Sequence, residues 1–173
     1  LGLRGEGNFP AFEQALKGFS RYASGQDRLL VLIDYTKPST EKRFYILDLL
    51  QKKLLLSTYV AHGRGSGDNY AVAFSNRPGS YQSSLGFFRT GDTYMGKNGY
   101  SLFLDGLEKG INDKARERAI VVHGANYADP AVLKGQQRLG RSLGCPALPP
   151  DISKQVIDTM KAVSYTHLRA HET

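Results

Sequence analysis

The chain has 173 residues, of which 40% are hydrophobic and 23% charged, and its formal net charge is +7. This length suits one domain with a single core, and the composition excludes a disordered chain, a collagen-like repeat and a coiled coil. No apolar run approaches the 18 residues of a membrane-spanning helix. A single Cys excludes an intrachain disulfide and a Cys-rich zinc module.

The first predicted elements are a helix and a strand. Between residues 9 and 23, apolar side chains recur at the spacing of one helix face, at Phe9, Phe12, Leu16 and Phe19. The apolar run Arg28–Thr36 is stopped by a Lys-Pro-Ser turn, which predicts a buried strand.

Two further strands are predicted in the run RFYILDLLQKKLLLSTYVAHG, folded about Gln51-Lys52-Lys53. The stretch from Gly63 to Ser84 is rich in Gly, Ser and Asn, which predicts a long loop. Long ordered loops in compact domains are usually functional, so we expect this loop to lie near the site.

Three more strands are predicted at Leu85–Gly91, Tyr100–Leu107 and Arg118–Gly124. A loop follows over Gly135–Pro150. The last helix begins at Asp151, after two prolines, with an apolar stripe at Ile152, Val156, Ile157 and Met160. We therefore expect a mainly β (α+β) domain with flanking N- and C-terminal helices.

Both ends of the chain bear on which residues are native. The chain begins at Leu1 without Met, which suggests an interior fragment whose N-terminus is missing. The last segment, Val163–Thr173 (VSYTHLRAHET), resembles a translated sequencing adapter, so we expect one native domain over residues 1–162 and a non-native tail. The tail holds His167 and His171, which leaves His62 and His123 as the native histidines.

The motif with the clearest chemistry surrounds Cys145, in QRLGRSLGCPALP. A lone Cys is most often a small buried hydrophobe. Here, however, Gly140 and Gly144 precede it among polar residues, which is not the pattern of a core strand. Glycine beside a nucleophile lets backbone N–H groups converge on one point, and Pro146 holds Cys145 extended. We therefore predict that Cys145 is a nucleophile.

A thiol with a pKa near 8.5 needs a base or a positive field to act at neutral pH. His123 is the candidate base, because it ends the apolar run AIVVHG and Gly124 turns the chain away. His62 is the runner-up, since it also ends an apolar run before a Gly. The two His and Cys145 could together bind zinc, but they lack a close ligand pair, so we predict no metal.

Nucleotide and nucleic-acid binding are not favoured. The stretch GDTYMGKN matches the phosphate-loop pattern up to Asn98, which replaces the magnesium-binding hydroxyl, and a strand-like run follows it. Ten Tyr and eight Phe could stack on bases, but no RNP-like motif or concentrated basic stripe accompanies them.

The segments VVHGA and GRSLGCPAL together resemble the L,D-transpeptidase catalytic domain, whose signature is an HG pair followed by an S-x-G-C loop. The segments AHGRGSG and SSLGFFRTGDTYMGKNGYSLFLDGLEKGIND are similar to its murein L,D-transpeptidase branch, and the resemblance covers about residues 29–150. It implies an L,D-transpeptidase-like β-sandwich.

The resemblance implies Cys145 as nucleophile and His123 as base, with Gly124 orienting the imidazole and Ser142 and Gly144 shaping the nucleophile loop. Many members of the family carry an Arg shortly after the Cys, where this chain has Pro146-Ala147, and the His-to-Cys gap here is longer. If that Arg binds a substrate carboxylate, Arg141 or Arg138 must substitute. The residues expected to bind substrate are Arg141, Arg138, His62, Tyr94 and Tyr127.

The function implied is cysteine-dependent transfer on peptidoglycan stem peptides through a thioester, without a cofactor or metal. It would form cross-links or release the terminal D-Ala. A hydrolytic cysteine amidase or carboxypeptidase, and a catalytically silent wall-binding module, remain open. By resemblance we expect a bacterial protein exported to the cell envelope or periplasm, acting as a monomer, with no nucleic-acid partner.

Overall fold

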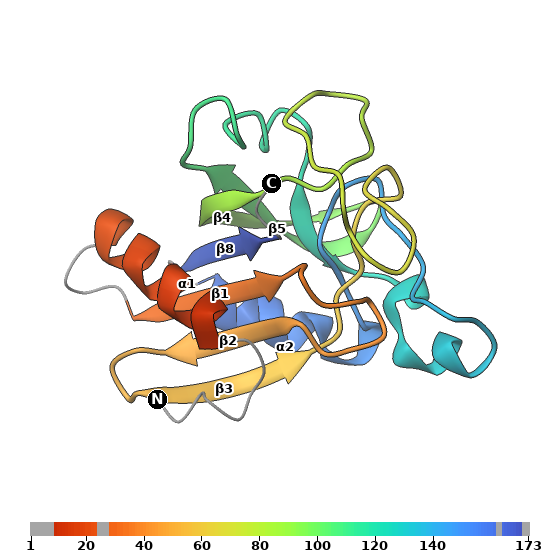
Figure 1. Ribbon diagram of the computed structural model, residues 1–173, viewed down its shortest axis with the longest axis horizontal. Helices are drawn as coiled ribbons and strands as arrows, with labels where there is room; N and C mark the ends of the chain where they lie inside the picture. Colours follow the sequence, from red (N-terminus) through yellow and green to blue (C-terminus); the bar gives the residue numbers. More distant parts are fainter. Residues whose placement is uncertain (1–8, 24–27, 162–163, 171–173) are drawn as a thin grey trace.

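The computed structural model describes residues 9–23, 28–161 and 164–170 (Figure 1). Two α-helices, α1 (Phe9–Tyr22) and α2 (Pro150–Met160), accompany eight strands in the described part of the chain. The strands are β1 (Leu29–Asp34), β2 (Phe44–Asp48), β3 (Lys53–Thr58), β4 (Gly86–Gly96), β5 (Gly99–Gly106), β6 (Val121–Gly124), β7 (Ala147–Leu148) and β8 (Tyr165–Arg169).

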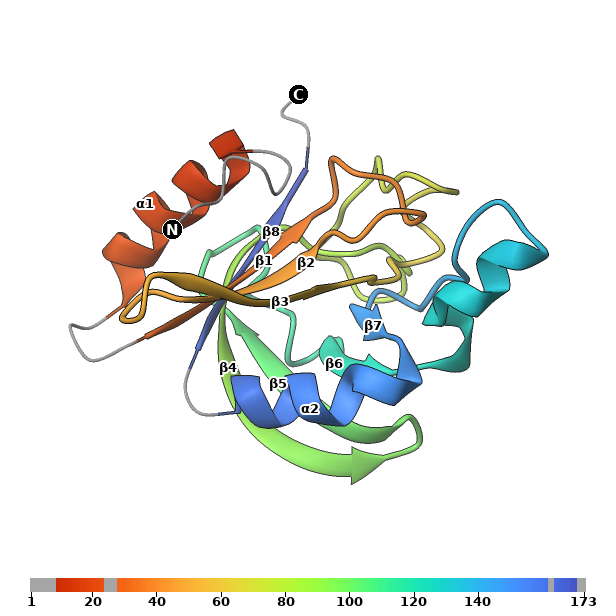
Figure 2. The ribbon, with the colours of Figure 1, turned by 90° about the horizontal axis from the view of Figure 1, so that it is seen from below.

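All eight strands belong to one hydrogen-bonded sheet in the order β3-β2-β1-β8-β4-β5-β6-β7. The neighbours β1 and β8, and β6 and β7, are parallel, whereas the other pairs are antiparallel. The sheet twists so strongly that the β4–β5 hairpin crosses beneath β1, β2 and β3 (Figure 2). The two halves therefore face each other, as in the predicted β-sandwich, while remaining continuous through β8 and β4.

The main core lies between these two halves. Alternate residues of β1 and β2, including Val31, Ile33 and Ile46, share one buried cluster with Leu102, Leu104 and Val122 of β5 and β6. Helix α2 lies between the halves in Figure 2 and buries Val156, Ile157 and Met160 in the same cluster. The opposite faces of β1 and β2 bury Leu30, Leu32 and Tyr45 under Phe12 and Ala15 of α1. The mainly β class with two flanking helices is thus confirmed.

Most predicted elements are present, with shifted ends. The predicted strand Leu85–Gly91 continues as β4 to Gly96, because its second half pairs with β5 as far as Gly96 opposite Gly99. The rejected phosphate-loop motif is therefore the end of a strand and its Lys97-Asn98 turn. The predicted loop from Gly63 to Ser84 is confirmed: it contains none of the helices and strands given above, and only isolated β-bridges.

The segment beyond α2 differs most from the sequence-based expectation. Residues Tyr165–Arg169 form β8, which joins the two halves of the sheet, although we expected no structural role for them. Three buried polar atoms of this strand, on Thr166, His167 and Arg169, have no hydrogen-bond partner in the described part of the chain. The foreign origin of residues 163–173 stays a prediction, which the nucleotide sequence across Ala162 tests.

Candidate active site

Strand pairing brings the predicted nucleophile and base together. Strands β6 and β7 run parallel with His123 opposite Ala147, and Ala61 bridges the other side of Ala147. Cys145 lies two residues before Ala147, and Val121 lies two residues before His123. Cys145 and Val121 therefore fall side by side, and the Val121 N–H contacts the Cys145 sulfur. Cys145 itself precedes β7, and its contact with Val121 places the thiol beside strand β6. The loop carrying Cys145 is thus held in register against the strand that carries His123.

The Cys145 thiol is held by backbone groups of the segment before His123. The Val121 N–H donates to Sγ at 3.4 Å, and the thiol donates to the Ala119 carbonyl oxygen at 3.3 Å. Ala119 has a φ of +56°, which is unfavourable for a residue with a Cβ. Burial raises the pKa of the Cys145 thiol, opposed by the Val121 N–H, Arg118 and Lys97. The resting group is therefore a neutral thiol.

The His123 imidazole is held by the backbone of the next residue. His123 is 3% exposed, and its Nδ1 lies 2.9 Å from the Gly124 carbonyl oxygen. A carbonyl can only accept, so Nδ1 carries the proton in the neutral ring and Nε2 keeps its lone pair. Burial lowers the pKa of His123, against the Gly124 hydrogen bond. Among the described residues Nε2 has no hydrogen-bond partner, and it is not bonded to the Cys145 thiol.

The nucleophile loop is closed by Ser142. Its hydroxyl donates to the Cys145 carbonyl oxygen at 2.6 Å and accepts the Gly144 N–H at 3.1 Å. Gly144 has a φ of +129°, and a Cβ there would lie 2.9 Å from the Gln82 carbonyl oxygen. The loop thus requires glycine at this position.

These contacts correct one expectation about the loop. The backbone N–H groups beside the nucleophile were expected to converge on one point, but the Gly144 N–H is already bonded to Ser142. The Cys145 N–H has no hydrogen-bond partner within residues 9–23, 28–161 and 164–170, so it is the free donor beside the thiol.

Arg118 is a site residue that sequence reasoning missed. Its guanidinium donates to the carbonyl oxygens of Ser75 and Gln82, at 2.8 and 2.7 Å. It also donates to the hydroxyls of Ser84 and Ser80, at 2.7 and 3.1 Å. These four bonds hold the 75–84 part of the long loop against Gly144. The sequence offers only two signs of this role for Arg118: a basic residue directly before Ala119, and a long loop rich in Ser. No local pattern links the segment at Arg118 with that loop.

Replacement of Arg118 by Met is expected to lower the free energy of unfolding by about 2 kcal/mol, because two partly buried carbonyls and two hydroxyls lose a charged donor. It should also raise the thiol pKa further, since Arg118 lowers it in the wild type. The chain has one Cys, so the pH dependence of iodoacetamide alkylation reads Cys145 alone.

Two variants separate the charge of Arg118 from its geometry. Arg118→Lys should keep the pH midpoint of alkylation near the wild-type value. Its free energy of unfolding should nevertheless fall by most of the amount expected for Arg118→Met. Arg116→Met removes an exposed ion pair with Asp105 and should change both quantities little. An unchanged midpoint in Arg118→Met would contradict a field effect on the thiol.

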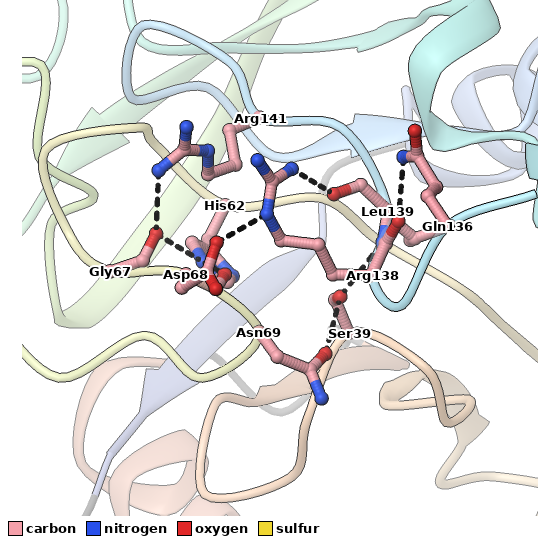
Figure 3. A network of polar contacts seen from close by, with 9 residues as sticks. All are labelled: Ser39, His62, Gly67, Asp68, Asn69, Gln136, Arg138, Leu139 and Arg141. Atoms are coloured by element: carbon pink, nitrogen blue, oxygen red, sulfur yellow. Dashed lines mark hydrogen bonds and ion pairs between the residues drawn. The ribbon is translucent and has the colours of Figure 1, made fainter. Parts of the chain in front are cut away.

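Three of the predicted substrate-binding residues instead join two loops, as Figure 3 shows. Arg138 forms an ion pair with Asp68 and donates to the Leu139 carbonyl oxygen at 2.9 Å. Arg141 donates to the Gly67 carbonyl oxygen at 3.3 Å, and His62 Nε2 lies 2.9 Å from the Asp68 carbonyl oxygen (Figure 3). These contacts fasten the start of the long loop to the segment before Cys145. They do not support substrate binding by the three residues.

His62 is also unsuited to the alternative role of base or zinc ligand. It is 1% exposed, and its Nδ1 accepts from the Arg43 guanidinium at 2.8 Å. The proton therefore sits on Nε2, which donates to Asp68. Burial, and then the charge of Arg43, lower the pKa of His62 to about 4. Both ring nitrogens are thus used inside the protein, and His62 is a neutral structural group.

Tyr94 and Tyr127 stay predicted substrate contacts. Tyr94 lies on β4 opposite Ser101, which in turn lies opposite His123. The Tyr94 ring stacks on Phe103, with 4.6 Å between the ring centroids. Tyr127, in the 3-10 helix η2 (Asn126–Ala128), packs against the loop at Gly140. Burial, and then the charge of Cys145, raise the pKa of Tyr127 to about 12.

The described residues contain neither a candidate metal site nor a helix that could span a membrane. No group of three His, Cys, Asp or Glu side chains among them could hold a metal ion. Neither α-helix in that part of the chain has the length and apolar character of a membrane span.

Comparison with known proteins agrees with this fold. The model of the L,D-transpeptidase catalytic domain family matches residues 4–168. No curated protein sequence matches the chain significantly.

The solved structures that resemble the chain share its fold at low sequence identity. A mutant of the helical cell shape determining protein Pgp2 from Campylobacter jejuni is 16% identical, with a TM-score of 0.57, over 87% of this chain and 50% of that one. L,D-transpeptidases from Mycobacterium smegmatis and Stackebrandtia nassauensis are each 13% identical, with TM-scores of 0.50. The matches cover 83% and 89% of this chain, and 59% and 61% of those. The chain thus spans about half to three-fifths of these proteins.

Proposed function

Because the chain belongs to the L,D-transpeptidase catalytic domain family, we propose that it is a cysteine acyltransferase acting on peptidoglycan stem peptides. One observation carries the proposal. The only thiol of the chain is held beside the strand that bears His123, whose Nε2 is unprotonated and has no hydrogen-bond partner among the described residues. A nucleophile with an adjacent base is the minimum that acyl transfer requires.

The resting protonation states favour proton transfer during attack over a preformed ion pair. Burial raises the thiol pKa and lowers the imidazole pKa, so both groups are neutral near pH 7. The thiol donates to Ala119 in the resting structure, so it must rotate toward His123 before it reacts. Hydrogen bonds of this kind commonly tighten only when substrate is bound.

The reaction then proceeds in two halves. His123 Nε2 removes the thiol proton as Sγ bonds to the carbonyl carbon of the amide between the diamino acid and the terminal D-Ala. The Cys145 N–H stabilises the oxyanion, an effect of about 3–4 kcal/mol for one well-placed donor. The imidazolium protonates the departing amine, which leaves D-Ala and a thioester. An acceptor amine then attacks the thioester, forming a new amide and restoring the thiol.

The alternative functions either share the first half of this reaction, the formation of the thioester, or lack it. A carboxypeptidase would form the same thioester and pass it to water, whereas a wall-binding module would form none. We propose a cell-envelope location and a bacterial wall substrate, which membership of this family supports. A monomeric state stays a prediction.

Product analysis distinguishes these functions. The 173-residue protein is incubated with purified stem tetrapeptide, and the products are identified by mass spectrometry. We expect a cross-linked dimer lighter by one D-Ala than two donors. A tripeptide alone would identify a hydrolase. Unchanged substrate with retained binding to wall material would identify a module and overturn the proposal.

A further inference from the structure

A cavity of about 370 Å³ opens beside the proposed base. Three segments line it: the turn between β4 and β5, the residues after His123, and the start of α2. Gly124, whose carbonyl orients the His123 imidazole, is part of its wall. A ligand in this cavity would therefore contact the residue that follows the proposed base and whose carbonyl orients it.

The lining of the cavity is positive and polar. Lys97 and the amides of Asn98 and Asn126 contribute to it, and no Asp or Glu is among the lining residues. All three side chains are exposed. Lys97 forms no ion pair within the described parts of the chain. An ammonium with free donors beside amide groups suits an anionic oxygen ligand.

Within the part of the chain that the structure describes, Lys97 is also a cation near the nucleophile that has no ion pair. Its charge, together with that of Arg118, lowers the pKa of the Cys145 thiol against the larger effect of burial. The Arg118 guanidinium already makes four hydrogen bonds to the 75–84 loop. Arg138 and Arg141 contact Asp68 and Gly67 instead. Among Arg118, Arg138, Arg141 and Lys97, only Lys97 both acts on the Cys145 thiol and has no hydrogen-bond or ion-pair partner in the described residues.

We propose that this cavity binds the terminal carboxylate of the donor stem peptide, with Lys97 as the charged partner and Asn98 and Asn126 as amide donors. The inference rests on the proposed function. The terminal carboxylate is one residue from the amide that Cys145 attacks. The same lysine can therefore bind the carboxylate and lie close to the thiol.

The placement has a consequence for the order of events. The carboxylate belongs to the leaving residue, so it departs with D-Ala and the cavity empties once the thioester has formed. The site therefore selects donors with a free terminal carboxylate and does not hold the acyl group. Donors whose terminus is amidated or extended lose the contact.

The test compares two peptides on protein that cannot turn them over. Cys145→Ala protein is titrated with stem tetrapeptide ending in a free carboxylate or in a carboxamide, and the two Kd values are measured by calorimetry. We expect the carboxylate form to bind about 10-fold more tightly, because a charge-assisted hydrogen bond is lost in the amide. This preference should shrink at high salt, since Lys97 is exposed.

Three further variants in the Cys145→Ala background locate the preference. Lys97→Met should bind both peptides equally, at the affinity of the amide form, and Lys97→Arg should restore most of the preference. Lys109→Met removes the same charge from an exposed position after β5 and should keep the wild-type ratio. An unchanged ratio in Lys97→Met, or no binding of either peptide, would overturn the inference.

Failure of the proposed function gives a different result. If the chain is not an acyltransferase, Cys145-containing protein forms neither dimer nor tripeptide, while the Lys97-dependent ratio in the binding experiment survives. If only the subsite is wrong, turnover is present and Lys97→Met lowers kcat/KM equally for both peptides or for neither.

Discussion

Cys145→Ala protein is expected to lose at least about 10⁴-fold in kcat for donor consumption, because no other residue can form the thioester. The chain contains no second Cys to substitute. Dimer and tripeptide are measured together by mass spectrometry, so that transfer and hydrolysis are both read. Covalent trapping gives an independent readout: intact mass should show an acyl adduct on wild-type protein and none on the variant.

Folding must be shown to survive this substitution. The Val121 N–H loses Sγ as an acceptor, which costs about 1–2 kcal/mol. Cys145→Ser keeps a hydroxyl at this position and should regain stability without regaining turnover. A folded Cys145→Ala protein that still consumes donor would refute the nucleophile assignment.

His123→Ala is expected to lower kcat/KM by about 10²–10⁴-fold, the usual effect of removing a general acid–base group. The wild-type pH profile should identify the same residue. The base must be unprotonated, and burial lowers the pKa of His123, so activity is expected to persist as the pH falls and to decline only below about pH 6.5. In His123→Ala this acid limb should disappear.

His62→Ala provides the matched control, since it removes the other imidazole that ends an apolar run before a Gly. The buried Arg43 guanidinium loses an acceptor at 2.8 Å, so the free energy of unfolding should fall by about 2–3 kcal/mol. With a folded pKa of about 4, His62 favours the folded state fully above about pH 6.5, and that contribution is lost as the pH falls toward 4. The acid limb of kcat/KM should remain. If His62→Ala impairs turnover more than His123→Ala, the base has been assigned to the wrong histidine.

The two histidines show how far local sequence could discriminate. Both end apolar runs and precede a Gly, so their local patterns are nearly identical. Pairing of β6 with β7 places Cys145 beside the strand of His123, whereas Arg43, 19 residues from His62 in sequence, occupies the other imidazole. Contacts between distant segments made the distinction, and no window around either histidine contains them.

The amino-acid sequence alone was sufficient for the mainly β class, both helices and most strands, and Cys145 and His123 as the reacting pair stay its prediction. Each depends on a periodicity or motif contained in a short stretch of chain. Only the tertiary structure decided that Arg138, Arg141 and His62 join loops, that the Gly144 N–H is already bonded, and that Arg118 holds the long loop beside the thiol. It also places Lys97 at a cavity beside Gly124. A side chain's hydrogen-bond partner depends on which distant backbone the fold brings within about 3 Å, and strand register sets that distance.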